Sequence, residues 1–452
     1  MTRIGTTQLS SQTTTAPAKP EATPILHRVR GKVLLLLCVM YAISYLDRTN
    51  ISTAGPTIMS ALHLNATQFG IAVSAFSIPY ALLQVFGGNL GERFGARKSL
   101  FWIGVLWGVA TIATGFSIGL LSLVGARLLL GLTEAAAFPT ATSAMSRWVP
   151  ADRNGFAQGV VHSASRLGNA AGPLIVGGLI IWGNSLHTVL AGWQISFLLI
   201  GLLSVVWALL WMWSYRDRPQ NHPKVTKEEL SEIPRELERA AQPATPWRRL
   251  MRTILPVAVV DFGYGWVLWV FLTWIPTFLT DTFHLPLSKY ALFTSVVLVG
   301  GVVGDTVGGM FADFLLRRTG NLRNSRRTVL LVGLVGSLLW LVPLLFAHTL
   351  VVATVSLSLS FFFLELCNAT LWAIPMDVAP EWSGTASGMM NTGFGLAGIF
   401  SPIVFGAMVD SVGWQWPFGI SIGLLALSAV VATVMKPRRV LPRGVDDVAV
   451  AR

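Results

Sequence analysis

The sequence predicts an all-α membrane protein with twelve transmembrane helices in two six-helix bundles and both termini in the cytoplasm. Three observations carry this prediction: twelve long apolar runs, basic residues confined to alternate connections, and landmarks that recur half a chain apart. The 452-residue chain is 53% hydrophobic and only 12% charged, about half the charge of a typical soluble domain. So few polar groups could not cover a soluble protein of this size, and two cysteines cannot form a disulfide scaffold.

The apolar runs are long enough to cross a bilayer, which takes about 20 residues. In lipid each run must be helical, because unpaired backbone groups find no water there. The runs cover residues 33–56, 69–90, 99–117, 119–142, 156–182, 193–214, 255–280, 289–314, 327–346, 349–376, 384–410 and 415–435. The first run follows the basic residues directly, so we interpret it as an uncleaved helix rather than a signal peptide.

The distribution of Lys and Arg predicts the orientation of these helices. All but four of the 33 Lys and Arg residues lie in the N-terminal tail, the C-terminal tail or alternate connections. The exceptions are Lys289 and three arginines within the runs, Arg48, Arg127 and Arg166. The net charge of +12 is therefore a topology signal, and nucleic-acid binding is disfavoured.

Composition also predicts how the chain is divided. The one long polar connection, 215–252, is expected to be a cytoplasmic linker between two bundles. The expected segments on either side are a disordered cytoplasmic tail (1–27), an N-terminal bundle (28–214), a C-terminal bundle (253–436) and a cytoplasmic tail (437–452).

Landmarks shared by the two halves indicate a parallel repeat. Gly87-Gly88-x3-Glu92 corresponds to Gly308-Gly309-x3-Asp313, and Pro173-x3-Gly177 corresponds to Pro402-x3-Gly406, at nearly equal offsets. Parallel repeats of six spans, with a site at their interface, are typical of one large class of secondary transporters.

Three motifs resemble a known family. The loop Gly88-Asn89-Leu90-Gly91-Glu92-Arg93-Phe94-Gly95-Ala96-Arg97-Lys98 resembles the signature loop of the major facilitator superfamily, with Glu where Asp is more usual. Tyr45-Leu46-Asp47-Arg48-Thr49-Asn50 and Arg127-x6-Glu134-x3-Phe138-Pro139 resemble its anion:cation symporter family, which includes bacterial sugar-acid/proton symporters and phthalate-type permeases. The resemblance covers residues 28–436 and implies the major facilitator fold.

The signature loop implies a gate, because its glycines allow close helix approach and its charges can form and break a cytoplasmic latch. The expected latch residues are Gly88, Glu92, Arg93, Arg97 and, in the second half, Asp313. Asp305 lies two helical turns before Asp313 and is expected in the same network. The alternative is a basic loop that only obeys the orientation rule.

Charged residues inside the runs are costly in lipid and therefore indicate function. Arg127 and Glu134 share one helix face, and Arg48 lies on a polar stripe, so both helices are expected to line a central cavity. The resemblance implies that Asp47 and Glu134 carry protons and that Arg48 pairs with Glu134. Desolvation favours the neutral acid and a guanidinium favours the carboxylate, so helix movement would shift that balance. The alternatives are a static buried ion pair and, for Asp47, a helix-terminal acid at the cavity mouth.

Several residues are candidates for binding the substrate. The resemblance implies that Tyr45, Tyr80, Trp372 and Asn391 line the pocket, while Arg127 can partner either Glu134 or the substrate. Arg166 departs from the family pattern, and a buried Arg is a bidentate receptor for carboxylate, phosphate or sulfonate. Arg48 and Arg166 could then hold the two ends of a compact dianion. Internal pairing of Arg166 is the alternative, and Glu365 is a further candidate for the cavity.

The sequence thus predicts a transporter rather than an enzyme. We expect proton-coupled uptake, by alternating access, of a small organic anion such as a dicarboxylate, sugar acid, aromatic acid or sulfonated carboxylate. No P-loop or metal-binding motif is present in the sequence, so we expect no cofactor and a proton gradient as the driving force. The expected setting is a monomer in the lipid bilayer of a bacterial inner membrane. A proton-driven exporter and a non-transporting nutrient sensor remain alternatives.

Overall fold

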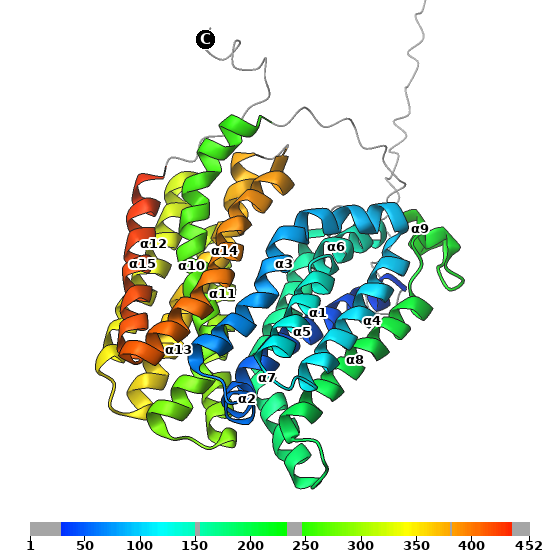
Figure 1. Ribbon diagram of the computed structural model, residues 1–452. Helices are drawn as coiled ribbons and strands as arrows, with labels where there is room; N and C mark the ends of the chain where they lie inside the picture. Colours follow the sequence, from blue (N-terminus) through cyan, green and yellow to red (C-terminus); the bar gives the residue numbers. More distant parts are fainter. Residues whose placement is uncertain (1–28, 150–153, 233–245, 380–381, 436–452) are drawn as a thin grey trace, which may run out of the picture.

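The computed structural model describes residues 29–149, 154–232, 246–379 and 382–435, and its regular elements in these ranges are all helices (Figure 1). Twelve helical stretches in the described residues are long and apolar enough to cross a membrane. This confirms the predicted all-α fold with twelve transmembrane helices. The two predicted tails lie outside the described residues.

The helices form two groups that are consecutive in sequence (Figure 1). The N-terminal bundle contains α1 (Val29–Thr53), α2 (Gly55–Leu62), α3 (Ala66–Phe94), α4 (Ala96–Gly115), α5 (Leu120–Glu134), α6 (Ala137–Trp148), α7 (Asn154–Ser185) and α8 (Gly192–Ser214). The C-terminal bundle contains α10 (Trp247–Phe283), α11 (Leu287–Thr319), α12 (Leu322–Leu341), α13 (Leu350–Val378), α14 (Ser383–Val412) and α15 (Gln415–Val434). The short α9 (Lys227–Glu232) belongs to the connection, and α10 begins within the stretch predicted as linker.

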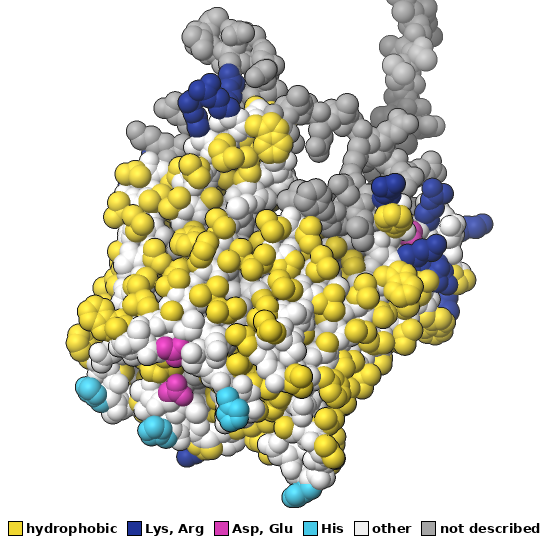
Figure 2. Space-filling model, in the orientation of Figure 1, with side chains coloured by type: hydrophobic (Ala, Val, Ile, Leu, Met, Phe, Trp, Pro, Cys, Tyr) yellow, Lys and Arg dark blue, Asp and Glu magenta, His cyan; other side chains and the backbone are white. Residues whose placement is uncertain are grey.

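The surface of the molecule is apolar along its sides. Figure 2 shows hydrophobic side chains over the flanks of both bundles, with Lys and Arg gathered toward the end where α1 begins and α15 ends. We call this the linker end, and we call the other the opposite end. A soluble protein rarely exposes so large an apolar surface, so the sides of the bundles are suited to contact lipid.

The fourth span is broken in its middle. The helix α5 ends at Glu134 and α6 begins at Ala137, with Ala135 and Ala136 as the junction. Pro139 accounts for the break, because proline has no N–H to donate to the carbonyl of Ala135 and its ring collides with that carbonyl. The consequence is that Glu134 lies at a helix end in the interior of the bundle.

The two bundles meet at the opposite end, and Figure 1 shows them lying apart at the linker end. The Tyr290 hydroxyl on α11 donates to the carbonyl of Thr53 on α1 at 3.0 Å. The Asp410 carboxylate on α14 accepts hydrogen bonds from the backbone N–H groups of Ala66 and Thr67, at 3.1 and 2.8 Å, and from the Thr67 hydroxyl. Asp410 thus binds the positive end of the α3 dipole from across the interface.

Candidate functional site

A buried ion pair lies inside the N-terminal bundle between α1 and α5. Arg48 Nη2 donates to Glu134 Oε1 at 3.2 Å, and the Ser44 hydroxyl donates to the same oxygen. Glu134 is fully buried and its Oε2 has no partner in the described part of the chain. We call Arg48 and Glu134 the N-bundle pair. Its two charges cancel, which offsets part of the cost of removing both from water.

Four aromatic rings surround the Arg48 guanidinium. Its Cζ lies 5.0 Å from the ring centre of Tyr45, 5.2 Å from Phe76, 4.9 Å from Tyr80 and 5.7 Å from Phe138. These rings come from α1, α3 and α6, and each attracts the cation through its π face. We call them the aromatic cage. The cage can keep a guanidinium in the interior whether its anionic partner is a glutamate or another anion.

Arg127 lies beside the cage rather than in the ion pair. Its guanidinium is 5.0 Å from the ring centre of Phe76, the ring that Arg48 also contacts. Arg127 is 2% exposed, and its Nε and Nη1 have no hydrogen-bond partner among the described residues. Buried donors without partners are costly, which makes Arg127 a candidate for binding an anion.

Asp47 points away from Arg48. Its Oδ2 accepts hydrogen bonds from Trp107 Nε1 at 2.9 Å and from the Thr111 hydroxyl at 2.7 Å, both on α4. The carboxyl group is buried and its Oδ1 has no partner within the described ranges. The charge of Arg127 acts on it electrostatically. Asp47 is therefore held between α1 and α4, on the side of α1 that faces α4.

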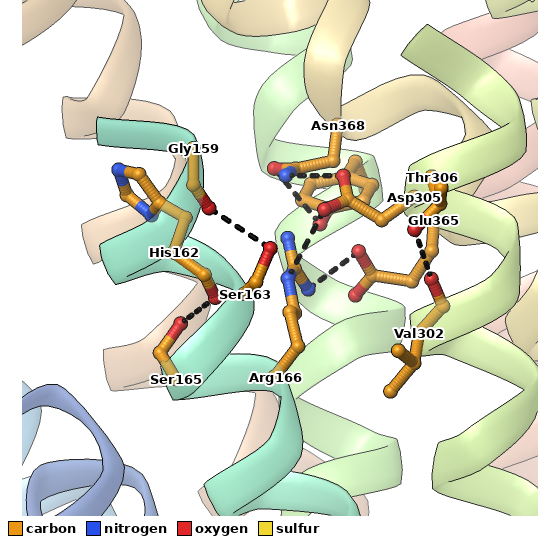
Figure 3. Close-up of polar contacts among 11 residues, drawn as sticks. Gly159, His162, Ser163, Ser165, Arg166, Val302, Asp305, Thr306, Glu365 and Asn368 are labelled. Atoms are coloured by element: carbon orange, nitrogen blue, oxygen red, sulfur yellow. Dashed lines mark hydrogen bonds and ion pairs between the residues drawn. The ribbon is translucent and has the colours of Figure 1, made fainter. Parts of the chain in front are cut away.

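A second charge cluster joins the two bundles. Figure 3 shows Arg166 extending from α7 between Asp305 on α11 and Glu365 on α13. Arg166 Nη1 lies 2.7 Å from Glu365 Oε2, and Arg166 Nε lies 3.3 Å from Asp305 Oδ2. Asn368 Nδ2 donates to Asp305 Oδ1 at 2.8 Å, and the Tyr264 hydroxyl donates to Asn368 Oδ1 at 3.3 Å. We call these five residues the cross-bundle cluster.

This geometry corrects one sequence prediction. Asp305 was expected in a cytoplasmic latch with Asp313, but it pairs with Arg166 deep in the molecule, and Asp313 is exposed near the end of α11. The two acids lie two turns apart on one helix, about 12 Å along its axis. Because the two acids share a helix face, the sequence indicated a common network. Their partners depend instead on how far along α11 each acid lies.

The signature loop is described only in part. The side chains of residues 84–92, including Gly88 and Glu92, are outside the described residues, and the Arg93 guanidinium stacks on Phe94 at 5.6 Å. Arg97 donates through its backbone N–H to Asp217 at 3.0 Å and through its side chain to the Met212 carbonyl. Arg97 is thus held within the N-terminal bundle, and the latch itself stays a prediction.

Two predicted pocket residues lie in the C-terminal bundle, apart from the N-bundle pair. Trp372 on α13 is 44% exposed and lies two turns from Glu365 toward the linker end. Asn391 on α14 is half-buried. Trp372, Asn368 and Glu365 follow helical spacing, so they share one face of α13. Glu365 is the residue of this face that contacts Arg166.

Sequence reasoning missed several groups that hold the charged residues. Ser44 precedes Arg48 by four residues, so its place on the same helix face was readable from the sequence. Trp107 and Thr111 on α4, which bind Asp47, gave no such signal, because their helix is remote in sequence. The same holds for Phe76, whose ring contacts both Arg48 and Arg127.

Comparisons with known proteins agree with this architecture. The family model for the Major Facilitator Superfamily matches residues 37–402 and 326–449. The probable sulfoacetate transporter of Cupriavidus necator is 46% identical over 414 residues, covering 91% of this chain and 94% of the relative. The hexuronate transporter of Bacillus subtilis is 31% identical over 420 residues, covering 92% and 96%. A solved structure of an inward-facing bacterial homologue of the lysosomal transporter Spinster shares the fold, with TM-score 0.74, 15% identity, and 92% and 97% coverage.

Proposed function

Because the chain belongs to the major facilitator superfamily, we propose that it carries a small organic anion across the membrane by alternating access. The observation that carries this proposal is the N-bundle pair inside its aromatic cage. A membrane protein without cargo has little reason to keep an arginine and a glutamate in its interior, because each is costly there. The similarity to carriers named for sulfoacetate and hexuronate supports an anionic cargo.

We propose that Glu134 couples this transport to a proton. An anionic cargo group that binds Arg48 competes with Glu134 for the guanidinium. Without that partner the buried carboxylate is left uncompensated, and binding a proton removes its charge. Cargo and proton then enter the same buried site together. Asp47 is the second proposed proton carrier, at the rear of this site and under the influence of Arg127.

The cargo that best fits the arginines is a compact dianion. Sulfoacetate carries a sulfonate and a carboxylate, and guanidinium groups bind both in a bidentate manner. Arg48 and Arg127 lie in the N-terminal bundle, and Arg166 lies at the interface of the bundles. A dianion between Arg48 and Arg166 would be held by two arginines of the N-terminal bundle. Arg166 also contacts Asp305 and Glu365 of the C-terminal bundle. We therefore propose a sulfonated carboxylate or dicarboxylate as the cargo.

We propose that the linker end faces the cytoplasm of a bacterial cell, with the protein in the inner membrane as a monomer. The basic residues at this end support the orientation, because positive charge is enriched on the cytoplasmic side. The contacts of Asp410 and Tyr290 join the bundles at the opposite end, which supports our proposal that this conformation is inward-facing.

The test is uptake by the purified full-length protein in proteoliposomes under an inward proton gradient. The panel contains sulfoacetate, a dicarboxylate, a sugar acid and an aromatic acid. We expect accumulation of sulfoacetate above its equilibrium level, and collapse of that accumulation when a protonophore is added. Accumulation of none of these anions would contradict the proposal, and accumulation that survives the protonophore would contradict proton coupling.

Glu134→Gln separates coupling from binding. The amide keeps the size of the side chain but cannot exchange a proton, so we expect uphill uptake to fall to the level of protein-free liposomes. Exchange of internal for external sulfoacetate needs no net proton movement and is expected to remain. Thr142→Val on α6, a neutral change in the same bundle, serves as the control. Uphill uptake retained by Glu134→Gln would exclude Glu134 as an obligatory proton carrier.

A further inference from the structure

The cross-bundle cluster contains one guanidinium and two carboxyl groups. Glu365 and Asp305 both lie within ion-pair distance of Arg166, at 2.7 and 3.3 Å. With both acids ionised the cluster would hold an uncompensated negative charge in the interior, whereas the N-bundle pair is neutral. An anionic cargo group that enters the cluster would add a second negative charge. That increase is strongly disfavoured away from water, and a buried carboxyl group avoids it by binding a proton.

The two acids differ in how well the protein supports their charge. Asp305 is 22% exposed and accepts a further hydrogen bond from Asn368, so its carboxylate keeps a donor if Arg166 turns to another partner. Glu365 is fully buried, takes its hydrogen bond from Arg166, and has an Oε1 without a partner in the described part of the chain. Glu365 is therefore the acid whose charge depends on Arg166.

We propose that Glu365 is a second proton-binding group, which takes up a proton when an anionic group of the cargo replaces it at Arg166. This inference rests on the proposed function. The exchange is balanced: the Arg166–Glu365 ion pair, a cargo anion and a proton become an Arg166–cargo ion pair and a neutral Glu365 carboxyl group. The proton bonds to a carboxylate oxygen of Glu365, and no other bond is made or broken.

The charged and titratable groups around this cluster do not supply a substitute cation for Glu365. They are His162 and Arg166 on α7, Asp305 on α11, Tyr264 on α10, Tyr45 on α1 and Cys367 on α13 itself. Among them Arg166 alone is permanently cationic. A cargo anion at Arg166 would otherwise share one guanidinium with two carboxylates, so proton uptake by Glu365 is the step that admits the cargo.

Replacing one acid at a time tests this assignment. In proteoliposomes, proton flux and labelled sulfoacetate flux are measured together for the wild type, Glu365→Gln and Asp305→Asn. We expect the proton-to-sulfoacetate ratio to fall by one in Glu365→Gln and to stay at the wild-type value in Asp305→Asn. An unchanged ratio in Glu365→Gln overturns the proposal, as does a fall in Asp305→Asn alone. Wild-type protein that transports no anion overturns the proposed function and this inference with it.

Infrared difference spectra give a readout that needs no transport. We expect sulfoacetate binding to the detergent-solubilised wild type to produce a carboxylic-acid C=O band that Glu365→Gln lacks and Glu134→Gln keeps. A wild-type spectrum whose C=O bands all disappear in Glu134→Gln would assign the proton to Glu134 alone and overturn the second site. This comparison also remains decisive if Glu365→Gln transports poorly.

Discussion

The two buried charge clusters differ in which bundle supplies the partners. Arg48 and Glu134 both belong to the N-terminal bundle, and their rings and hydroxyl partner come from the same bundle. Arg166 belongs to the N-terminal bundle, but its two acids lie on α11 and α13 of the C-terminal bundle. The first cluster is thus internal to one bundle, and the second bridges the two bundles.

This difference separates two tasks that one site must perform. A bundle that moves as a rigid body keeps all of its internal distances, so the movement itself would not break the exchange of cargo and proton that we propose at the N-bundle pair. Contacts between bundles have no such protection, and the cross-bundle cluster must change when the bundles rotate. The first cluster is suited to coupling alone, whereas the second, with the proton-binding group proposed at Glu365, is also suited to linking occupancy with conformation.

The largest expected effect comes from breaking the N-bundle pair. Arg48→Met leaves Glu134 buried without its counter-ion, and loss of one partner of a buried pair costs about 3–5 kcal/mol. The double variant Arg48→Met/Glu134→Gln removes both charges and is expected to regain most of that stability while remaining unable to transport. Thermal unfolding in detergent measures the stability of the single and the double variant. A single variant as stable as the wild type would show that the pair is already solvated.

Arg166→Gln is expected to affect cargo selection as well as stability, because it leaves Glu365 without its cation. Charge-assisted hydrogen bonds contribute about 1.5–3 kcal/mol each, so sulfoacetate uptake should fall roughly 10–100-fold. Uptake of acetate, which has no second anionic group for Arg166, should change by less than about threefold on the same scale. Arg166→Lys, which keeps the positive charge but cannot form the bidentate hydrogen bonds of a guanidinium, serves as the control. Equal losses for dianion and monoanion would contradict a role for Arg166 in cargo binding.

The sequence was sufficient for the membrane spans, because hydropathy is a property of contiguous residues. It was also sufficient to single out Arg48, Glu134 and Arg166, because a charge within an apolar run is visible without a structure. It did not reveal which helices would face each charge. Asp305 was placed in the wrong network for that reason, and the partners of Asp47 on α4 went unseen.

The break in the fourth span is encoded in the local sequence. Pro139 follows Glu134 by five residues, and proline in a helix interior predicts a break on its N-terminal side. The structure places the junction at Ala135 and Ala136, so the interruption of the fourth span was present in the sequence. The sequence did not decide between substrate binding and internal pairing for Arg166, because the two acids that pair with it lie on helices more than a hundred residues away.

Asp410→Asn tests a bridge between the bundles that has no part in binding cargo. The neutral amide accepts its hydrogen bonds from the start of α3 without the charge, and we expect a loss of about 1–2 kcal/mol at this contact. The population open at the opposite end should rise roughly 5–30-fold. Electron-resonance distances between spin labels at Ile118 and Phe346, both exposed at that end, measure the shift.

The exposed Asp281 on α10 offers a matched control for this variant. Asp281→Asn removes the same charge at the same end, without the contacts that Asp410 makes to Ala66 and Thr67. We expect its label distances to match those of the wild type. If Asp410→Asn also lowered the number of protons per sulfoacetate, the separation of gating contacts from coupling groups would be contradicted.

The smallest expected effect comes from the aromatic cage. Phe138 is the most distant of the four rings from Arg48, at 5.7 Å, and Phe138→Leu keeps an apolar side chain while removing the π face. We expect a loss of about 0.5–1 kcal/mol in the free energy of unfolding, with the proton number and the preference for dianions unchanged. The ring attracts the guanidinium equally whether Glu134 or cargo neutralises it, so it cannot bias the exchange between them. A changed proton number in Phe138→Leu would mean that the cage favours one partner, and that the N-bundle pair is tuned by its rings as well as by its charges.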